Sequence, residues 1–213
     1  TRWDITSSDA DLAAAVQGFE RAIALNSNHA QAVAWYAGQE LFSGKYAHAI
    51  ELFQRTLQLD PLARVSQLNL GESYAGIGEH RKALDTWLEC ARTNPDWPGA
   101  PDDIGLHLTN LGRLDEALAW TIRSRALSEE PWTVGNVAGV YGALGQTKRA
   151  VELLREGPRD HPFWALRQAL ARRVEGDVAG GLATVEGAIK DMEYAPPPYL
   201  SVAANLAVLQ GKF

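Results

Sequence analysis

Histidine, cysteine and neighbouring carboxylates are the residue types of this chain that could carry catalysis or hold a metal. The five histidines are spread along 213 residues, and none has a histidine or cysteine companion at metal-ligand spacing. They are His29, His48, His80, His107 and His161. No glycine-rich phosphate loop, nucleophile elbow or HExxH stretch occurs. The sequence therefore predicts no metal, no cofactor and no enzymatic activity.

Cys90 and the pair Asp102 and Asp103 are the remaining candidates for chemistry. A thiol can act as a nucleophile, and two carboxylates can act as general acid and base. Cys90, however, occupies a position that compact residues fill in other copies of the repeat described below, which favours buried packing. The aspartates open a predicted helix, where carboxylates complement free N–H groups and the helix dipole. None of the three is therefore interpreted as catalytic.

Composition limits the class of protein further. The chain is 46% hydrophobic and 22% charged, so it can bury a core. Its 20 basic and 26 acidic residues give a net charge of −6, which disfavours nucleic acid as a partner. No apolar run is long enough to predict membrane insertion. Thr1 indicates a cut or processed end, the 15 arginines hint at a GC-rich bacterial genome, and we expect a cytoplasmic location.

Small residues recur at a nearly constant interval. Six alanine or glycine positions form a register with a period of about 34 residues that shortens slightly in the last copies: Ala15, Ala49, Ala83, Ala117, Ala150 and Gly181. From the second copy onward, a glycine stands five residues before the register position, and the series continues once more at the end. These glycines are Gly44, Gly78, Gly112, Gly145, Gly176 and Gly211. They predict tight turns between two helices of each copy.

Two further positions in each copy hold compact residues, as expected where helices approach closely. One lies seven residues after the register position: Ala22, Thr56, Cys90, Ser124, Gly157 and Ala188. The other lies seven residues before each turn glycine: Ala37, Gly71, Gly105, Ala138, Ala169 and Ala204. Between these positions the apolar residues follow helical spacing, as in residues 46 to 59. The sequence therefore predicts an all-α array of helix–turn–helix units.

These motifs resemble the tetratricopeptide repeat (TPR) family, whose unit is a helix–turn–helix of about 34 residues. The best copy contains Leu70, Gly71, Tyr74, Gly78, Ala83, Trp87, Cys90 and Pro95, and the resemblance covers essentially the whole chain. It implies a right-handed superhelical solenoid whose inner surface is lined by the first helix of each unit. It also implies a module that binds other proteins.

The register divides the chain into a single array over residues 1–213. Residues 8–26 are expected to form a lone second helix and residues 197–213 a lone first helix. The five full repeats between them are predicted at 30–63, 64–97, 98–130, 131–161 and 162–196. Because an isolated repeat helix cannot bury its apolar face, we expect a fragment of a longer protein, with self-association through the unsealed terminal helices as a further hypothesis.

The resemblance also implies which residues face the groove. In the first two units these positions are Gln31, Ala34, Gly38, Leu41, Leu68, Asn69, Glu72 and Ala75. In the later units the candidates are Asp102, Asp103, Leu106, Asn110, Trp132, Gly135, Asn136, Gly139 and Arg167. This surface is amide-rich and acidic in its middle, with arginine toward its C-terminal side. We therefore expect a neutral to basic protein or peptide segment as the partner.

Some members of the family bind a C-terminal carboxylate with a clamp of Lys, Asn and Arg. The matching positions in this chain are Ala34, Gly38, Asn69, Gly99 and Asp103, and only the asparagine fits. The carboxylates nearby would repel an anion. A carboxylate clamp is therefore disfavoured.

The segment from about 132 to 144 is unusual because Gly135, Gly139 and Gly142 recur along one helical face. Against alanine, three interior glycines cost roughly 2 to 3 kcal/mol of helix stability. Either a partner approaches this bare backbone beside Trp132, or a neighbouring helix of the same chain fills the stripe or the helix bends. Trp132 is the preferred anchor of a partner, while Trp35, Trp87 and Trp120 have core-like spacing and are predicted to be structural.

Two functions are consistent with these patterns. The first is a non-enzymatic adaptor or scaffold that holds a protein segment in a concave groove. The alternative is the ligand- or peptide-sensing effector region of a bacterial regulator. The stretch from Arg2 and Trp3 to Leu25 resembles the entry to TPR regions attached to cyclase-type or winged-helix regulators.

Overall fold

The computed structural model describes residues 9–128, 130–157, 159–160, 163–190, 192 and 197–211. Over these ranges the regular secondary structure is α-helical and no β-strand occurs. Arg2 and Trp3, which carry part of the regulator resemblance, lie outside the described residues. The all-α class predicted from the sequence is confirmed.

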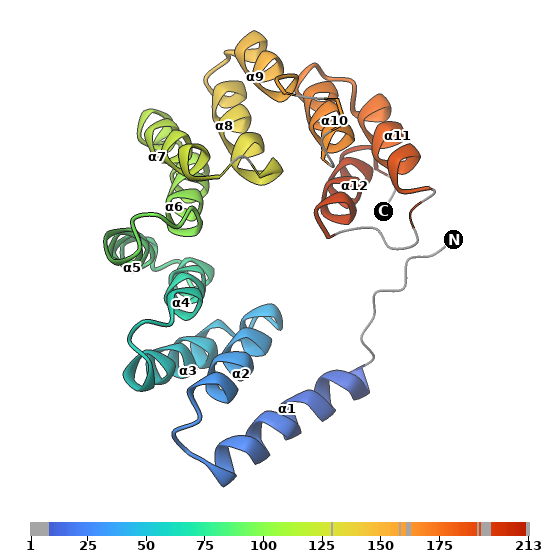
Figure 1. The fold of residues 1–213 in the computed structure, drawn as a ribbon. Helices are drawn as coiled ribbons and strands as arrows, with labels where there is room; N and C mark the ends of the chain where they lie inside the picture. The colour runs from blue at the N-terminus through green and yellow to red at the C-terminus, as the bar shows by residue number, and fades with distance from the viewer. Residues whose placement is uncertain are drawn as a thin grey trace. The chain divides into compact units, whose positions relative to one another are not determined.

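The helices fall into two compact units, Thr1–Pro95 and Asp96–Phe213 (Figure 1). Unit 1 contains α1 (Asp9–Leu25), α2 (Ala30–Phe42), α3 (Tyr46–Leu59), α4 (Arg64–Gly76) and α5 (His80–Thr93). Unit 2 contains α6 (Gly99–Asn110), α7 (Leu114–Leu127), α8 (Pro131–Ala143), α9 (Thr147–Leu154), α10 (Trp164–Val174), α11 (Val178–Ile189) and α12 (Pro197–Leu209). The organisation of residues 1–213 as one array, and its self-association through α1 and α12, stay predictions.

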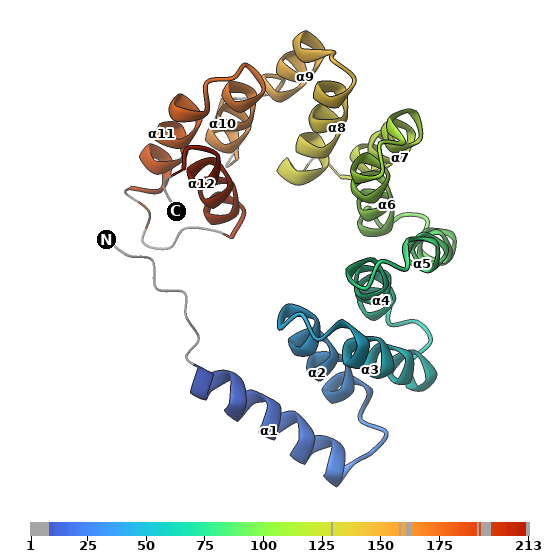
Figure 2. The same cartoon turned by 180° about the vertical axis from the view of Figure 1, so that it is seen from behind.

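The predicted glycine turns from Gly44 to Gly176 each join two helices that pack against each other as a hairpin (Figure 2). These glycines, and Gly211 after α12, have φ between 68° and 88°. Such angles are unfavourable for any residue with a Cβ atom. The residue after the glycine donates its N–H to a carbonyl five residues back, as Lys45 does to Glu40 at 2.9 Å. This bond satisfies a carbonyl that the ending helix leaves open, so the predicted turns are confirmed.

Two of the small residues before the turns lie against the second helix of the same hairpin. A Cβ atom at Gly71 would collide with the indole ring of Trp87, which is 3% exposed. The Trp87 Nε1–H donates to the Leu68 carbonyl at 2.9 Å, which fixes the ring over the glycine. At Gly105 a Cβ atom would collide with the side chain of Thr121. Close helix approach at these positions is therefore confirmed.

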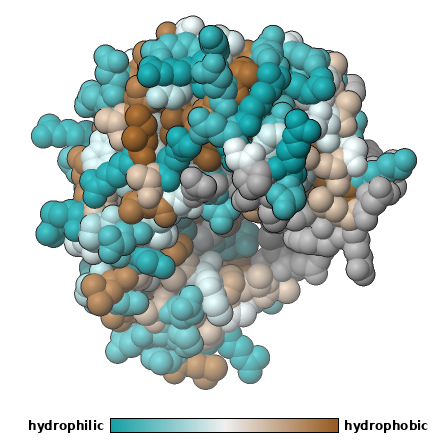
Figure 3. Space-filling view, turned by 45° about the horizontal axis from the view of Figure 1, so that its top comes forward, coloured by the Kyte–Doolittle hydropathy of each residue, from teal (hydrophilic) through white to brown (hydrophobic). Residues whose placement is uncertain are grey.

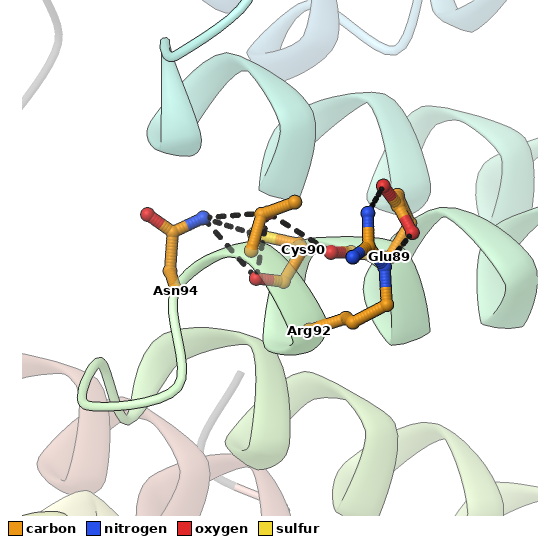
Figure 4. A network of polar contacts seen from close by, with 5 residues as sticks. Glu89, Cys90, Arg92 and Asn94 are labelled. Atoms are coloured by element: carbon orange, nitrogen blue, oxygen red, sulfur yellow. Dashed lines mark hydrogen bonds and ion pairs between the residues drawn. The ribbon is translucent and has the colours of Figure 1, made fainter.

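Cys90 occupies the second compact position and is fully buried in α5, as predicted. Its thiol lies 3.8 Å from the Arg64 carbonyl, 26 residues earlier. The Ser124 hydroxyl donates over the same separation, to the Pro98 carbonyl at 3.2 Å. Figure 4 shows the Asn94 amide directed at Cys90, with its Nδ2 atom 3.1 Å from the carbonyl oxygen and 3.9 Å from Sγ. This environment is that of a packing residue.

The prediction of a helical contact at Gly157 is wrong. Helix α9 ends at Leu154, so Gly157 lies beyond it, exposed and with a φ of 94°. In the sequence a proline follows Gly157, and a proline offers no N–H to continue a helix. With eight residues, α9 is shorter than its counterparts α3, α5 and α7, which have 14 each.

Candidate functional site

Unit 1 contains a groove of about 660 Å³ between α2, the end of α3 and α4. Phe19 of α1 borders it, and Phe53 and Thr56 of α3 are the buried residues beneath it. The remaining lining residues come from α2, from the connector between α3 and α4, and from α4: Ala30, Gln31, Ala34, Trp35, Gly38, Gln39, Phe42, Asp60, Leu62, Ala63, Arg64, Val65, Ser66 and Asn69. Its volume lies within the range of ligand-binding clefts in proteins.

Large apolar side chains in this groove are exposed to solvent. Trp35 is 60% exposed and Val65 57%, while Phe42 and Leu62 reach 85% and 86%. One exposed apolar residue needs no explanation, but several that line the same groove indicate an interaction surface. The groove therefore offers a partner apolar area that the chain itself leaves uncovered.

The connector between α3 and α4 is held in place by hydrogen bonds rather than by burial. The Asp60 carboxylate accepts the Leu62 N–H at 3.1 Å, and the Asp60 carbonyl accepts the Ala63 N–H at 3.2 Å. These bonds form a turn around Pro61, which keeps Leu62 at the surface beside the groove. The exposed leucine is therefore presented by a defined backbone.

The interpretation of Trp35 as a structural residue is wrong. Its ring lines the groove, with its centroid 6.5 Å from that of Phe19. The register of the repeats contains a signal that could have found it. Trp35 stands one repeat length before Asn69, a predicted groove residue, and the two therefore occupy equivalent positions of α2 and α4.

Of the other groove candidates in unit 1, Gln31, Ala34, Gly38 and Asn69 line the groove. Leu41, in contrast, is buried in the core formed by α2, α3 and α4. Glu72 lies on α4 one turn beyond Asn69 and is exposed, although the surrounding protein atoms still desolvate its carboxyl and raise its pKa.

In unit 2 the candidates Asp102 and Asn136 are brought together. Asp102 lies in the first turn of α6, accepts the Ser124 hydroxyl of α7 at 3.2 Å and is hydrogen-bonded to Asn136 of α8. Burial raises the pKa of Asp102, and the two hydrogen bonds partly oppose this rise. Asn136, predicted to face the groove, therefore already has an intramolecular hydrogen-bond partner. Asp103, beside Asp102, is half-buried.

The remaining unit 2 candidates on α6 and α8 are more open. Leu106 and Asn110 are exposed on α6, and Trp132 is exposed at the start of α8. A Cβ atom built at Gly139 or Gly142 would have no heavy atom within 4 Å, whereas at Gly135 it would lie 3.3 Å from a methyl carbon of Leu170 in α10. A neighbouring helix therefore approaches only one of the three glycines.

The structure contradicts the assignment of Arg167 to an open groove. This side chain is 7% exposed and donates to two carbonyls at the end of α9. Its Nη2 lies 2.8 Å from the Leu153 oxygen, and its Nε lies 3.2 Å from the Leu154 oxygen. The carbonyls of the last turn of a helix are only partly satisfied by its own N–H groups, and here the Leu153 carbonyl accepts the Glu156 N–H at 3.3 Å; Arg167 adds side-chain donors to this helix end.

A buried charge that the sequence did not reveal lies in the hairpin of α2 and α3. Glu40 is 2% exposed, and its carboxylate contacts Lys45 Nζ at 3.0 Å and His48 Nδ1 at 2.8 Å. Burial raises the pKa of Glu40, but the hydrogen bonds from His48 and Lys45 outweigh it and hold the pKa below its ordinary value. This network stabilises the hairpin that carries one wall of the groove.

The titratable residues of the described ranges do not gather into a metal centre. No group of three or more His, Cys, Asp or Glu side chains is placed there to hold a metal ion. Among the helices described, none is long and apolar enough to cross a membrane. Figure 3 shows one face of the molecule, on which hydrophobic patches lie among hydrophilic side chains.

This chain is an all-helical protein built from repeated hairpins. Exposed apolar side chains on α2, on α4 and next to these helices line a groove in unit 1. No family model matches the chain. It is 30% identical over 107 residues to human tetratricopeptide repeat protein 28, a match that covers 50% of this chain and 4% of that protein. It is also 36% identical over 76 residues to the photosystem I assembly protein Ycf3 of Synechococcus elongatus, covering 34% of this chain and 44% of Ycf3.

Solved structures give the same result for the fold. Yeast Tom70 superposes with a TM-score of 0.67 at 16% sequence identity, over 98% of this chain and 45% of Tom70. YrrB, described as a TPR protein with an unusual peptide-binding site, superposes with a TM-score of 0.54 at 17% identity, over 93% of this chain and all of YrrB. The chain therefore has the all-helical fold of repeated hairpins seen in solved TPR proteins.

Proposed function

We propose that this chain is a non-enzymatic docking module and that the groove of unit 1 binds a segment of another protein. The single observation that carries the proposal is the exposed apolar lining formed by Trp35, Phe42, Leu62 and Val65. Burial of apolar area contributes about 25 cal/mol per Å², so two or three such side chains suffice to anchor a peptide. The names of Ycf3, an assembly protein, and YrrB, with its peptide-binding site, support binding as the role of such repeats.

A photocrosslinking amino acid at position 65 tests this proposal. Val65 lines the groove, whereas Glu51 lies on α3, is exposed and does not line it, so position 51 is the matched control. We expect position 65 to yield discrete crosslinked proteins that position 51 does not yield. Each captured protein should then bind the purified chain in calorimetry and lose affinity for the Val65→Glu variant. Equal crosslinking from both positions contradicts the proposal.

We propose that the same function extends to unit 2, with the exposed Leu106 of α6 and Trp132 of α8 and the open backbone at Gly139 as candidate contacts. Its support is the open space over the Gly139 backbone, because no neighbouring helix occupies that space to compensate for the low helix propensity of glycine. Gly139→Leu should abolish binding of a partner there while leaving thermal stability unchanged or higher. Gly135→Leu would instead meet Leu170, so a loss of stability there is the expected contrast. Unfolding of the Gly139→Leu chain would contradict this assignment.

A further inference from the structure

The surface of α4 changes from apolar to acidic along one stripe. Val65, Asn69 and Glu72 stand at i, i+4 and i+7 of the helix, a spacing that places them on one face. Val65 and Asn69 line the groove, and Glu72 follows one turn later. With a rise of 1.5 Å per residue, the apolar and acidic ends of the stripe lie about 10 Å apart.

Glu72 is exposed on α4. Its equivalent position on α2, one repeat length earlier, is Gly38, which lines the groove. No heavy atom lies within 4 Å of the place where a Cβ atom at Gly38 would stand. In the part of the chain that the structure describes, no hydrogen bond or ion pair engages the Glu72 carboxylate. The Glu72 carboxylate, one turn beyond the groove residue Asn69, is therefore open to a cationic side chain of a bound segment.

The charges around the groove favour a cation at that place. Asp60 and Arg64, at the connector end, have opposite signs, and Glu72 adds a negative charge toward the other end of α4. Residues 1–95 as a whole carry eight basic and eleven acidic side chains. An anionic segment would therefore meet an unfavourable field along the whole of unit 1.

We propose that the groove of unit 1 selects a protein segment that has an apolar side chain against Trp35 and Val65 and a lysine or arginine against Glu72. The inference rests on the proposed docking function and adds the chemistry of the partner. The two contacts of the segment lie about 10 Å apart, which corresponds to three residues of extended chain or two turns of helix. Segments with Asp or Glu at the second contact are excluded by repulsion from Glu72.

A display library of short random peptides, selected on the full chain, tests the inference without knowledge of the partner. We expect the enriched peptides to combine apolar residues with a Lys or Arg. Synthetic, dye-labelled versions are then titrated by fluorescence anisotropy. Exchanging the basic residue for Glu should weaken binding to the native chain about tenfold, and the loss should shrink at high salt.

The reciprocal change in the chain identifies the contact. Glu72→Lys should lower the affinity for the peptide with the basic residue and restore the affinity for its Glu version. Glu51→Lys makes the same charge change at an exposed position of α3 and should alter neither affinity. Two results would overturn this inference and leave the docking proposal standing. In the first, peptides bind less tightly to Trp35→Glu but show no preference for a basic residue. In the second, Glu72→Lys and Glu51→Lys change their affinity equally. A selection without any binder sensitive to Trp35→Glu overturns the docking proposal as well.

Discussion

The contact between Gly71 and Trp87 provides a quantitative test of how the repeats hold together. In Gly71→Ala, the new methyl group would stand less than 3 Å from three atoms of the indole ring. The ring cannot move outward freely, because Trp87 is 3% exposed and its Nε1–H bonds to the Leu68 carbonyl at 2.9 Å. The added methyl group must therefore displace α4 from α5 or break that hydrogen bond.

The expected cost follows from two opposing effects. Overpacking a filled core by one methyl group destabilises by about 1 to 3 kcal/mol. Replacing glycine by alanine inside a helix returns about 1 kcal/mol through helix propensity. The net loss is therefore between about 0 and 2 kcal/mol. Gly139→Ala is the matched control, because it makes the same change in α8 with no heavy atom within 4 Å and should stabilise by up to about 1 kcal/mol.

Hydrogen exchange followed by mass spectrometry measures these effects locally, which suits a chain of two compact units. Peptides from α4 and α5 should lose protection by up to roughly 30-fold in Gly71→Ala, the factor that corresponds to about 2 kcal/mol. Peptides from α8 should gain protection in Gly139→Ala. Increased protection of α4 and α5 in Gly71→Ala, like the gain expected for α8 in Gly139→Ala, would refute the close approach of these helices.

Variants at three further positions test individual contacts. In urea titrations, Cys90→Ser should change the unfolding free energy by less than about 1.5 kcal/mol, because a serine fills the equivalent position of the next repeat. Cys90→Leu should instead lower the unfolding free energy by about 1 to 3 kcal/mol through overpacking. Glu40→Gln should cost about 1 to 3 kcal/mol at neutral pH through the lost charged hydrogen bonds. Because the pKa of Glu40 is lowered on folding, this stabilisation is present above about pH 4.5 and is lost as the pH falls through the folded value, so the difference from the native chain should narrow in acid. Arg167→Met should lower the melting temperature of unit 2 and leave peptide binding at the unit 1 groove unchanged; weakened binding would contradict its role as a helix cap.

The turns and the helix contacts were predictable because each depends on the backbone of one residue or on one short distance. A turn with φ near 75° requires glycine, and the approach of α4 to α5 requires a residue without a side chain at Gly71. Such requirements repeat wherever the hairpin repeats. They therefore appear in the sequence as a register of residue types.

The exposed wall of the groove was not predictable in the same way. In α2, Trp35 stands between the buried Val33 and Ala37, and most of the helix is apolar or small. Hydrophobic periodicity identifies a buried face only when the opposite face is polar, and α2 has no such contrast. The position of Trp35 in the repeat, rather than its residue type, contains the missing information.

The roles of Arg167 and Glu40 depend on neighbours that the sequence does not place. Arg167 is equivalent in register to Asn69, yet its side chain donates to the Leu153 and Leu154 carbonyls at the end of α9, a helix that ends early. Glu40 is buried because Lys45 and His48 reach it across a turn. In both cases, a tertiary contact decides between exposure and burial for a charged side chain.

Equivalent positions of the repeat explain how such a fold separates stability from recognition. The side of each first helix that faces its second helix must stay small, as at Ala37 and Gly71, because a larger residue would push the hairpin apart. The adjacent side carries no such requirement, and the same register position holds tryptophan at 35 and asparagine at 69. Residues on that side can change without loss of the hairpin, so the binding surface of each repeat is set independently of the contacts that fold it.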